Sequence, residues 1–303
     1  MIDSKLLISI IINCFNGEKF LRETIDSVVN QTYTNWEIIF WDNQSTDSTA
    51  EIVQSYKDNR IRYFYAPKHT PLGEARNLAM KEAKGDYIGF LDADDVWTYS
   101  FLETYVNYAK QNPAASLIYS KYKAVFKELK WYSNNRQKAV EIPIDVFVKH
   151  YDVGMSSAIF KREIIENFQI KFDNRFSLIE DYDFFIRIGV TGNILSIPEP
   201  LMVYRYHEGN LSRSDKWCDE LSLLLNLSIS KTRGYENHYP FVRIFWILRN
   251  HYKVYQLIKQ NKKLEALKII FYTSIYDFRF LRLLLVVVGG VDIAKTIKSI
   301  FNR

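Results

Sequence analysis

Three carboxylates follow an apolar run near the end of the first third of the sequence. Asp86–Leu91 has the composition of a buried strand, and Asp92, Asp94 and Asp95 come directly after it. Because alternate residues of an extended chain point to the same side, we expect Asp92 and Asp94 to face one way. Two carboxylates on one side suit a divalent ion such as Mg²⁺ or Mn²⁺ that carries a diphosphate. The alternative is a solvated acidic turn, in which Asp95 is the expected N-cap of a helix starting near Tyr99.

Two earlier strands are also predicted to end in polar side chains. Leu6–Ile12 and Trp36–Trp41 are β-branched and aromatic runs, typical of buried parallel strands. The polar residues that follow these runs are Asn13, Asn16, Asp42 and Asn43. Because parallel strands of an open sheet present their carboxyl ends at one edge, these side chains are expected to converge with the acidic cluster.

Strand and helix patterns alternate through the first half of the chain. Further strands are predicted at residues 61–65, 86–91, 116–120 and 156–160, and helices at 18–31, 46–56, 72–83 and 99–111. This order predicts an α/β fold with right-handed crossovers, a mostly parallel central sheet and flanking helices.

The second half is harder to assign. Residues 122–143 fit no regular pattern, whereas residues 177–189 have helical spacing and contain Glu180, Asp181 and Asp183. Short strands are predicted at 194–197 and 201–206, separated by Pro198 and Pro200. From Asp215 the pattern is helical, with breaks near Gly234, Pro240 and Gly289–Gly290.

Composition limits the setting in which the protein works. The chain has 303 residues, of which 48% are hydrophobic and 25% charged, and its two cysteines, Cys14 and Cys218, lie far apart. Such sparse cysteines favour a reducing compartment. The first residues do not look like a signal peptide, and no run approaches the roughly 18 apolar residues of a spanning helix.

The net charge of +5 is unevenly distributed. Residues 235–303 hold twelve Lys or Arg against four Asp or Glu, so the rest of the chain has a net charge of −3. Basic helices with an apolar face bind anionic membrane surfaces, although such a region could instead pack on the body or on a second subunit. We expect a cytoplasmic protein, peripheral at the inner face of the plasma membrane, and no nucleic-acid partner.

From Ile8 to Trp97 the sequence resembles the nucleotide-binding half of family 2 inverting glycosyltransferases of the bacterial surface-polysaccharide type, which have the GT-A fold. The matching segments are Ile12–Gly17, Gln31–Tyr33, Asp42–Asp47, Gly73–Asn77, Gly85–Ile88 and Leu91–Asp95, the last of which contains the family's Asp-x-Asp (DXD) motif. The resemblance continues more loosely through Glu180–Asp181 and Tyr204–His207. It implies a GT-A domain at 1–212, divided into a nucleotide-binding half (1–97) and an acceptor half (98–212), and a helical, basic region at 213–303.

The resemblance also implies roles for particular residues. Asp181 would be the general base, and the charge of Glu180 beside it would raise its pKa. A divalent metal, Mn²⁺ or Mg²⁺, would bind Asp94, with Asp92 and His207 nearby. The residues implied for donor binding are Asn13, Asn16, Asp42, Asn43, Arg76, Asp92 and Arg205. Many family members have an acidic residue where this chain has Asn43, which leaves the nucleotide base less defined.

The implied reaction is the transfer of a single sugar, with inversion, from a nucleoside-diphosphate-sugar to a hydroxyl group of a glycan or lipid-linked acceptor. A UDP-sugar is the favoured donor. The Gln-x-x-Arg-Trp motif of processive synthases is absent from the sequence. Two alternatives stay open at this point: a nucleotidyltransferase, which needs no base at Glu180–Asp181, and a catalytically silent GT-A-like binding module.

Overall fold

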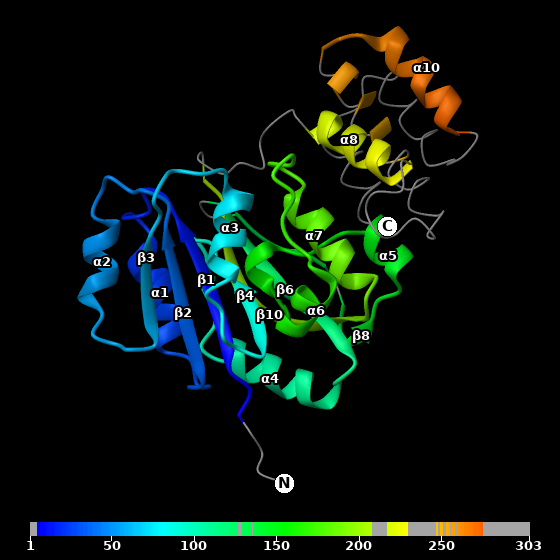
Figure 1. Ribbon diagram of the computed structural model, residues 1–303. Coiled ribbons are helices and arrows are strands. Elements are labelled where there is room, and N and C mark those ends of the chain that lie inside the picture. Colours follow the sequence, from blue (N-terminus) through cyan, green and yellow to red (C-terminus); the bar gives the residue numbers. More distant parts are fainter. Residues whose placement is uncertain are drawn as a thin grey trace. The chain divides into compact units, whose positions relative to one another are not determined.

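The computed structural model describes residues 5–126, 129–134, 136–207, 217–229, 247, 249–250, 253–254, 256–258 and 260–274 (Figure 1). The chain divides into two compact units. The first comprises Met1–Phe147 and Tyr151–Asn210, and the second comprises Val148–His150 and Leu211–Arg303. All of the candidate site residues belong to the first unit.

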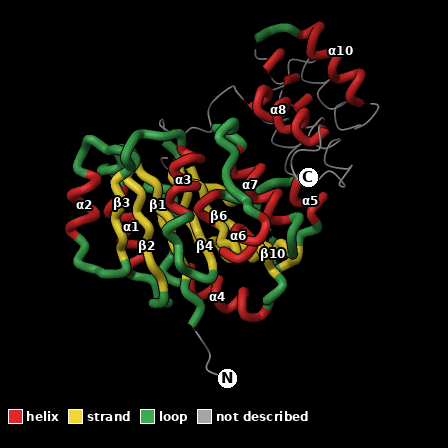
Figure 2. Tube along the Cα trace, in the orientation of Figure 1, coloured by secondary structure: helices red, strands yellow, loops and turns green. Residues whose placement is uncertain are grey.

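The first unit is built on one sheet whose strand order is β3-β2-β1-β4-β9-β6-β10-β5. Its amino-terminal strands are β1 (Ile8–Cys14), β2 (Trp36–Asp42), β3 (Ile61–Tyr65) and β4 (Tyr87–Phe90). These four are parallel to one another. The connecting helices are α1 (Leu21–Val29), α2 (Thr49–Ser55) and α3 (Leu72–Met80). The predicted α/β alternation is therefore confirmed, and Figure 2 shows these strands lying side by side.

The sheet becomes mixed beyond β4. Strand β9 (Ala158–Lys161) lies antiparallel between β4 and β6 (Ala115–Phe126), and β6 is parallel to β10 (Asn193–Arg205). Three short strands pair antiparallel with these: β5 (Val96–Trp97) and β8 (Val140–Glu141) with β10, and β7 (Leu129–Tyr132) with β6. The region 122–143, which fits no sequence pattern, thus supplies the end of β6, β7 and β8.

The prediction of two separate strands around Pro198 and Pro200 was wrong. Both segments belong to the single strand β10, which stays paired with β6 while its register shifts between Ile197 and Pro200 and again between Pro200 and Met202. Proline is tolerated in a strand at such irregularities because its missing N–H does not interrupt the remaining ladder.

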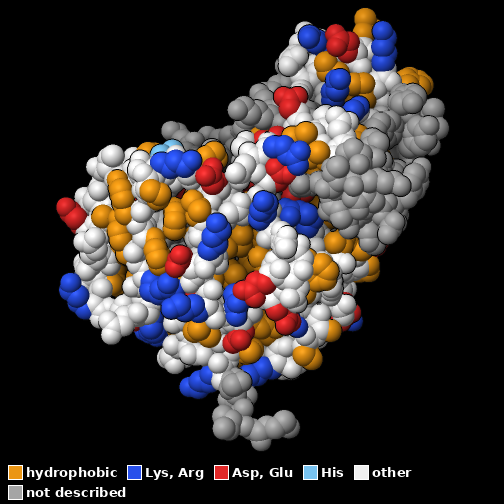
Figure 3. All heavy atoms as spheres, in the orientation of Figure 1, with side chains coloured by type: hydrophobic (Ala, Val, Ile, Leu, Met, Phe, Trp, Pro, Cys, Tyr) orange, Lys and Arg blue, Asp and Glu red, His pale blue; other side chains and the backbone are white. Residues whose placement is uncertain are grey.

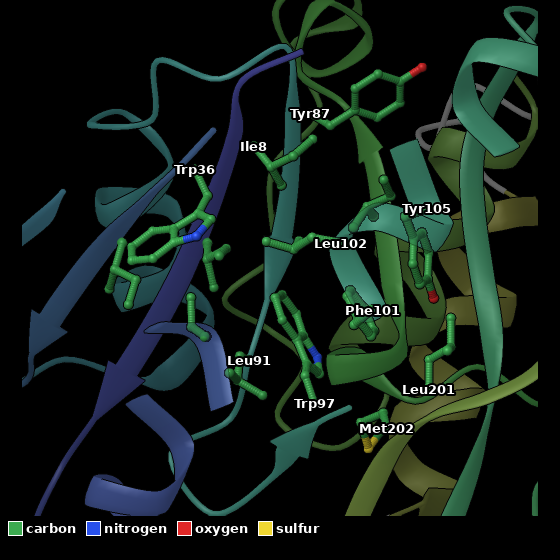
Figure 4. Close-up of a cluster of buried hydrophobic side chains, with 14 of the residues drawn as sticks. Ile8, Trp36, Tyr87, Leu91, Trp97, Phe101, Leu102, Tyr105, Leu201 and Met202 are labelled. Carbon is green, nitrogen blue, oxygen red and sulfur yellow. The ribbon is translucent and has the colours of Figure 1, made fainter. Parts of the chain in front are cut away.

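Helices cover both faces of the sheet. On one face α1, α2 and α4 (Phe101–Gln111) pack against the apolar residues of β1 and β2. Figure 4 shows the centre of this cluster, where Trp97 and Phe101 stack with ring centroids 3.8 Å apart and Tyr105 extends the stack. On the other face Phe184 of α7 (Glu180–Gly189) stacks on Phe172 at 4.0 Å. Phe184 also meets Phe160 of β9 edge-on at 5.3 Å, and this contact fixes α7, with its acidic first turn, to the sheet.

The remaining short helices are α5 (Ile144–Lys149), the 3₁₀ turn η1 (Met155–Ser157) and α6 (Arg162–Phe168). In the second unit the structure describes α8 (Trp217–Ile229) and α10 (Lys263–Ser274), so the part of 213–303 that can be described is helical, as predicted. A small buried cluster there comprises Ile247, Val254, Leu257, Ala266 and Ile270. The predicted breaks at Gly234, Pro240 and Gly289–Gly290 lie outside the described residues. Within the described ranges no helix is long and apolar enough to cross a membrane.

Candidate active site

The carboxyl ends of β1, β2 and β4 lie at one edge of the sheet, which we call the carboxyl edge. Cys14 at the end of β1 is in register with Asp42 at the end of β2, and the backbone N–H of Asn43 donates to the Cys14 carbonyl at 2.7 Å. On the other side of β1, the Leu91 N–H donates to the Ile11 carbonyl at 2.9 Å. The polar segments that follow the three strands are therefore neighbours.

Asp92–Asp95 is a tight turn and not a continuation of β4. The strand ends at Phe90, and the Asp95 N–H donates to the Asp92 carbonyl at 3.0 Å. The expectation that Asp92 and Asp94 alternate along an extended chain was therefore wrong. Both side chains nevertheless keep accessible surface, 40% for Asp92 and 28% for Asp94. Partial burial, together with the charge of Asp94, raises the pKa of Asp92, and the positive charge of Arg76 opposes that shift.

Asp95 is not a helix cap. Its side chain is buried, with Oδ2 accepting a hydrogen bond from Ser156 Oγ at 2.7 Å and Oδ1 accepting one from the Arg205 backbone N–H at 3.2 Å. The residue at the N-cap of α4 is Ser100. Burial and the nearby charges of Asp92 and Asp94 raise the pKa of Asp95 well above its ordinary value. Asp95 thus joins the acidic turn to the end of β10.

The segment after β10 brings His207 to the acidic turn. His207 Nε2 lies 2.8 Å from Asp94 Oδ2, and the imidazole stacks on the ring of Phe20 at 5.4 Å. The Arg205 guanidinium pairs with Glu23 of α1 and lies over the same phenyl ring, 5.1 Å from its centroid. Residues 205–207 therefore lie against the first turn of α1 as well as against the acidic turn.

Three of the residues implied for donor binding hold loops of the protein itself. Asp42 is fully buried, and its oxygens accept hydrogen bonds from the Ser45 N–H and the Tyr63 hydroxyl, both at 2.7 Å. The Asn43 side chain donates to the Thr70 carbonyl at 2.7 Å and accepts from the Thr70 N–H at 3.1 Å and the Thr70 hydroxyl at 3.2 Å.

Asn16 has a left-handed backbone with φ of 55°, and its Oδ1 accepts from the Thr46 N–H at 2.8 Å. The side chains of Asp42, Asn43 and Asn16 therefore shape the loops at this edge.

Asn13 and Phe15 differ from those residues: the Asn13 amide has no hydrogen-bond partner among the described residues, and much of the Phe15 side chain is exposed. Both amide atoms of Asn13 are buried with no hydrogen-bond partner among the described residues. Phe15 is 52% exposed, and its ring meets that of His69 edge-on at 4.5 Å. His69 in turn lies 2.8 Å, through Nδ1, from the Asn43 carbonyl. Phe15 was not predicted as a site residue, since a lone aromatic in so aromatic a chain gives no distinctive signal.

Arg76 of α3 lies between two carboxylates. One terminal nitrogen is 3.0 Å from Asp92 Oδ1 and the other is 2.5 Å from Glu180 Oε1. The side chains of Arg76 and Glu180 are each only 6% exposed. The Arg76 guanidinium is therefore buried between two carboxylates, whereas a residue that binds a diphosphate is expected to face solvent.

Asp181 occupies the first turn of α7. Its Oδ1 accepts a hydrogen bond from the Tyr182 N–H at 2.7 Å, and its Oδ2 accepts one from the Tyr151 hydroxyl at 3.1 Å. Burial raises the pKa of Asp181; the bond from Tyr182, the charge of Arg76 and the bond from Tyr151 oppose the rise. The charge of Asp92 adds to the rise, whereas Glu180, the expected source of such a charge, is paired with Arg76.

Asp183, the other acidic residue of this turn, lies elsewhere. It is fully buried and forms an ion pair with Arg187 at 2.7 Å, one helical turn further along α7. Its role is therefore to hold α7 together. Tyr151 was not predicted from the sequence, because it lies in the segment between α5 and η1, where no pattern marked it.

One pair of side chains, Asp94 and His207, offers candidate ligands for a metal ion. In the part of the chain that the structure describes, no group of three or more His, Cys, Asp or Glu side chains is arranged to hold a metal. Asp94 and His207, however, present a carboxylate oxygen and an imidazole nitrogen 2.8 Å apart. This distance is that of a hydrogen bond between the two side chains, and both groups are of kinds that ligate metal ions.

Comparison with known proteins places this arrangement in a family. The sequence profile described as glycosyl transferase family 2 matches residues 9–168. Two relatives from Escherichia coli are the UDP-Glc:alpha-D-GlcNAc-diphosphoundecaprenol beta-1,3-glucosyltransferases WfaP and WfgD. WfaP is 27% identical over 248 residues, which is 80% of this chain and 93% of WfaP. WfgD is 29% identical over 221 residues, which is 71% of this chain and 82% of WfgD.

Solved structures share the fold. TarS 1–349 of S. aureus in complex with UDP-GlcNAc superposes with a TM-score of 0.65 at 20% identity, covering 74% of this chain and 67% of that one. The mannosyltransferase PcManGT from Pyrobaculum calidifontis, in complex with GDP-Man and Mn²⁺, gives 0.60 at 16% identity, covering 99% of this chain and 86% of that one. The predicted GT-A fold is thereby confirmed.

The profile match extends over more than half of the chain and includes β1–β4, the acidic turn and β9. This match decides against the nucleotidyltransferase alternative. The chain belongs to glycosyl transferase family 2.

Proposed function

We propose that this glycosyltransferase moves one sugar from a UDP-sugar to a hydroxyl group of a lipid-linked glycan, with inversion at the anomeric carbon. The observation that carries the proposal is the Arg76 bridge. It joins Asp92 of the acidic turn to Glu180, the residue before Asp181. A potential metal site and a potential base therefore border the same part of the carboxyl edge.

The donor half of the proposal rests on the unsatisfied groups at the end of β1. The buried Asn13 amide can both donate and accept, as recognition of a uracil edge or a ribose hydroxyl requires. The exposed ring of Phe15 offers a flat apolar surface to a nucleotide base. UDP-sugars are the donors named for the relatives WfaP and WfgD, and TarS binds UDP-GlcNAc.

The donor set at the acidic turn fits a divalent cation. Asp94 and His207 would supply two ligands, Asp92 would lie beside them, and the diphosphate and water would complete the coordination. Such an ion, when bound, stabilises the negative charge that develops on the departing diphosphate. Arg205, which pairs with Glu23 across the ring of Phe20, would hold the His207 segment over this site.

Asp181 would act as the general base. Its carboxylate would take the proton of the acceptor hydroxyl while that oxygen bonds to the anomeric carbon and the bond from this carbon to UDP breaks. A single displacement of this kind inverts the anomeric centre. The raised pKa of Asp181 makes the carboxylate a stronger base than an exposed aspartate, and Tyr151 holds its Oδ2.

For the acceptor, we propose a sugar carried on a polyprenyl diphosphate at the inner face of the plasma membrane. WfaP and WfgD are named for a diphosphoundecaprenol-linked acceptor. The positive surplus of residues 235–303 would hold the protein at an anionic surface. Basic residues of this region that the structure describes are Arg249, Lys253, Lys262, Lys263 and Lys268.

The test is thermal unfolding with UDP, GDP or dTDP, each with and without Mn²⁺, combined with a UDP-release assay using UDP-sugars. UDP with Mn²⁺ should raise the melting temperature, since ligand at about 100 times its Kd adds about 2.7 kcal/mol to stability. The shift should disappear in Asp94→Ala. Stabilisation by another nucleotide alone would refute the UDP assignment, and UDP binding without any sugar transfer would favour the silent binding module.

A further inference from the structure

Arg76 is the most deeply buried cation at the carboxyl edge, and it joins three separate elements. It projects from α3, pairs with Asp92 in the turn after β4, and pairs with Glu180 at the start of α7. Its guanidinium also lies 5.4 Å from the ring centroid of Phe172 and 5.7 Å from that of Phe90. The two terminal nitrogens are thus committed to carboxylates, and the faces of the group lie near aromatic rings.

A second residue of α3 is adapted to the same contact. A Cβ added at Gly73 would lie 2.9 Å from Glu180 Oε2 and 3.3 Å from the Cβ of Phe172. Gly73 and Arg76 are three residues apart and therefore share one face of the helix. The absence of a side chain at Gly73 lets Glu180 approach α3, and Arg76 compensates its charge.

We propose that Arg76 is a positioning residue that fixes the first turn of α7 to the acidic turn, and so holds Asp181 at a set distance from the donor, without binding the diphosphate itself. This inference rests on the function proposed above. Removing one partner from a buried, hydrogen-bonded charge pair leaves the other charge uncompensated, so breaking this link is unfavourable. Rate is sensitive to such links because a displacement of about 1 Å between reacting groups can cost about 10²-fold.

The closing experiment separates positioning from phosphate binding. Arg76→Lys keeps a positive charge, but its single ammonium cannot make the paired contacts of a planar guanidinium. We expect kcat to fall about 10- to 100-fold, while the calorimetric Kd for UDP in the presence of Mn²⁺ changes less than about 3-fold. A rise in that Kd of about 10-fold or more would show that Arg76 grips the diphosphate and would overturn the proposal.

Three further variants test whether Arg76 acts through Glu180: Glu180→Gln, its combination with Arg76→Lys, and Gly73→Ala. If Arg76 acts through that carboxylate, Glu180→Gln should lower kcat, and the double variant should be about as slow as the slower single variant. Independent, multiplicative losses would contradict the proposal. Gly73→Ala leaves every charge in place but displaces Glu180, so it should also lower kcat with little change in UDP affinity; unaltered kcat would count against the proposal.

Arg62 provides a matched control. It also bridges two carboxylates, Glu37 at 3.1 Å and Glu82 at 3.2 Å, and lies near the ring of Phe64, but it belongs to β3 and is outside the proposed machinery. Arg62→Lys should leave kcat unchanged; an equal loss would mean that Arg76 has only a general structural role. Failure of the proposed function can be told apart from failure of this inference. If the proposed function is wrong, the wild-type enzyme will transfer no sugar from UDP-sugars. The UDP affinity of the variants would still report whether Arg76 contacts the diphosphate.

Discussion

At the scale of single residues, the hydroxyl of Tyr151 is the side-chain donor that holds Asp181. Tyr151 has ring contacts with Tyr182 at 4.9 Å and Phe147 at 5.6 Å, so its hydroxyl is aimed by packing on two sides. Burial, followed by the charge of Asp181, raises the pKa of Tyr151 well above its ordinary value, so the hydroxyl remains a donor at neutral pH. Its bond stabilises the ionised form of Asp181 and lowers the pKa of that carboxyl.

Tyr151→Phe should therefore raise the pKa of Asp181. A general base works only when ionised, so the acid limb of a plot of log kcat against pH should move to higher pH. The other charges that act on Asp181, Arg76 and Asp92, are unaltered. Tyr99→Phe, at a position that is 70% exposed, is the control and should leave the profile unchanged. An acid limb in the wild-type position would show that Tyr151 does not tune the base.

Only part of the arrangement of the candidate site residues could be predicted from the sequence. Motif matching located Asp92, Asp94, His207 and Asp181, since each is a polar residue at a recognisable strand or helix end. It could not show that Asp42, Asn43 and Asn16 form hydrogen bonds with Ser45, Thr70 and Thr46, respectively. Those partners are set by loop geometry, which depends on contacts between residues distant in sequence.

At the scale of secondary-structure elements, α1 supports the acidic turn through direct contacts. The hydroxyl of Thr24, a fully buried residue, lies 3.0 Å from the Ala93 carbonyl and 2.9 Å from the Asp95 carbonyl. The 3₁₀ turn η1 also supports the acidic turn, because Ser156 Oγ accepts the Asp92 N–H at 3.0 Å while donating to Asp95. The position of Asp94 therefore depends on two elements that carry no proposed catalytic group.

Thr24→Val should weaken this support without changing the size of the side chain much. Leaving the buried carbonyls of the turn without their donor should cost about 1–3 kcal/mol of stability, measured by denaturant unfolding. It should also raise the Kd for Mn²⁺ measured with UDP present. Thr104→Val, at a partly exposed position of α4, is the matched control. A stable variant with unaltered Mn²⁺ affinity would show that α1 does not position the turn.

Elements with a strong local pattern could be predicted, and those defined by their neighbours could not. The β-branched run of β1 and the helical spacing of α7 are visible in the sequence itself. Strands β7 and β8 are short and pair at the margins of β6 and β10, so only the partner strand makes them regular. Likewise β10 reads as interrupted at Pro198 and Pro200, although its pairing with β6 carries it past both.

At the scale of the whole molecule, charge is divided along the chain. On the face shown in Figure 3, Lys and Arg side chains of the first unit are interspersed with Asp and Glu. The surplus of eight positive charges belongs to residues 235–303. The basic residues of this region that lie outside the described residues are Arg243, Lys259, Arg279, Arg282, Lys295, Lys298 and Arg303. A membrane role for this region therefore rests on its composition and on the lipid-linked acceptors named for WfaP and WfgD.

The full chain should bind vesicles that contain anionic lipid and should not bind neutral vesicles. Binding measured by co-sedimentation should fall as salt rises from about 0.1 M to about 1 M, because the Debye length shrinks from about 10 Å to about 3 Å. Replacing Lys262, Lys263 and Lys268 with Gln should weaken it. Equal binding to neutral and anionic vesicles, or none to either, would contradict an electrostatic membrane role.

In the proposed reaction Asp181 takes the proton of the acceptor while other residues bind the donor. The most direct test is single-turnover transfer from a UDP-sugar by Asp181→Asn, alongside its calorimetric affinity for UDP with Mn²⁺. Because the side chain contacts Tyr151 and the backbone of Tyr182, we expect unchanged UDP affinity and a rate reduced by about 10²–10⁴-fold. Transfer at close to the wild-type rate would show that the base is another group.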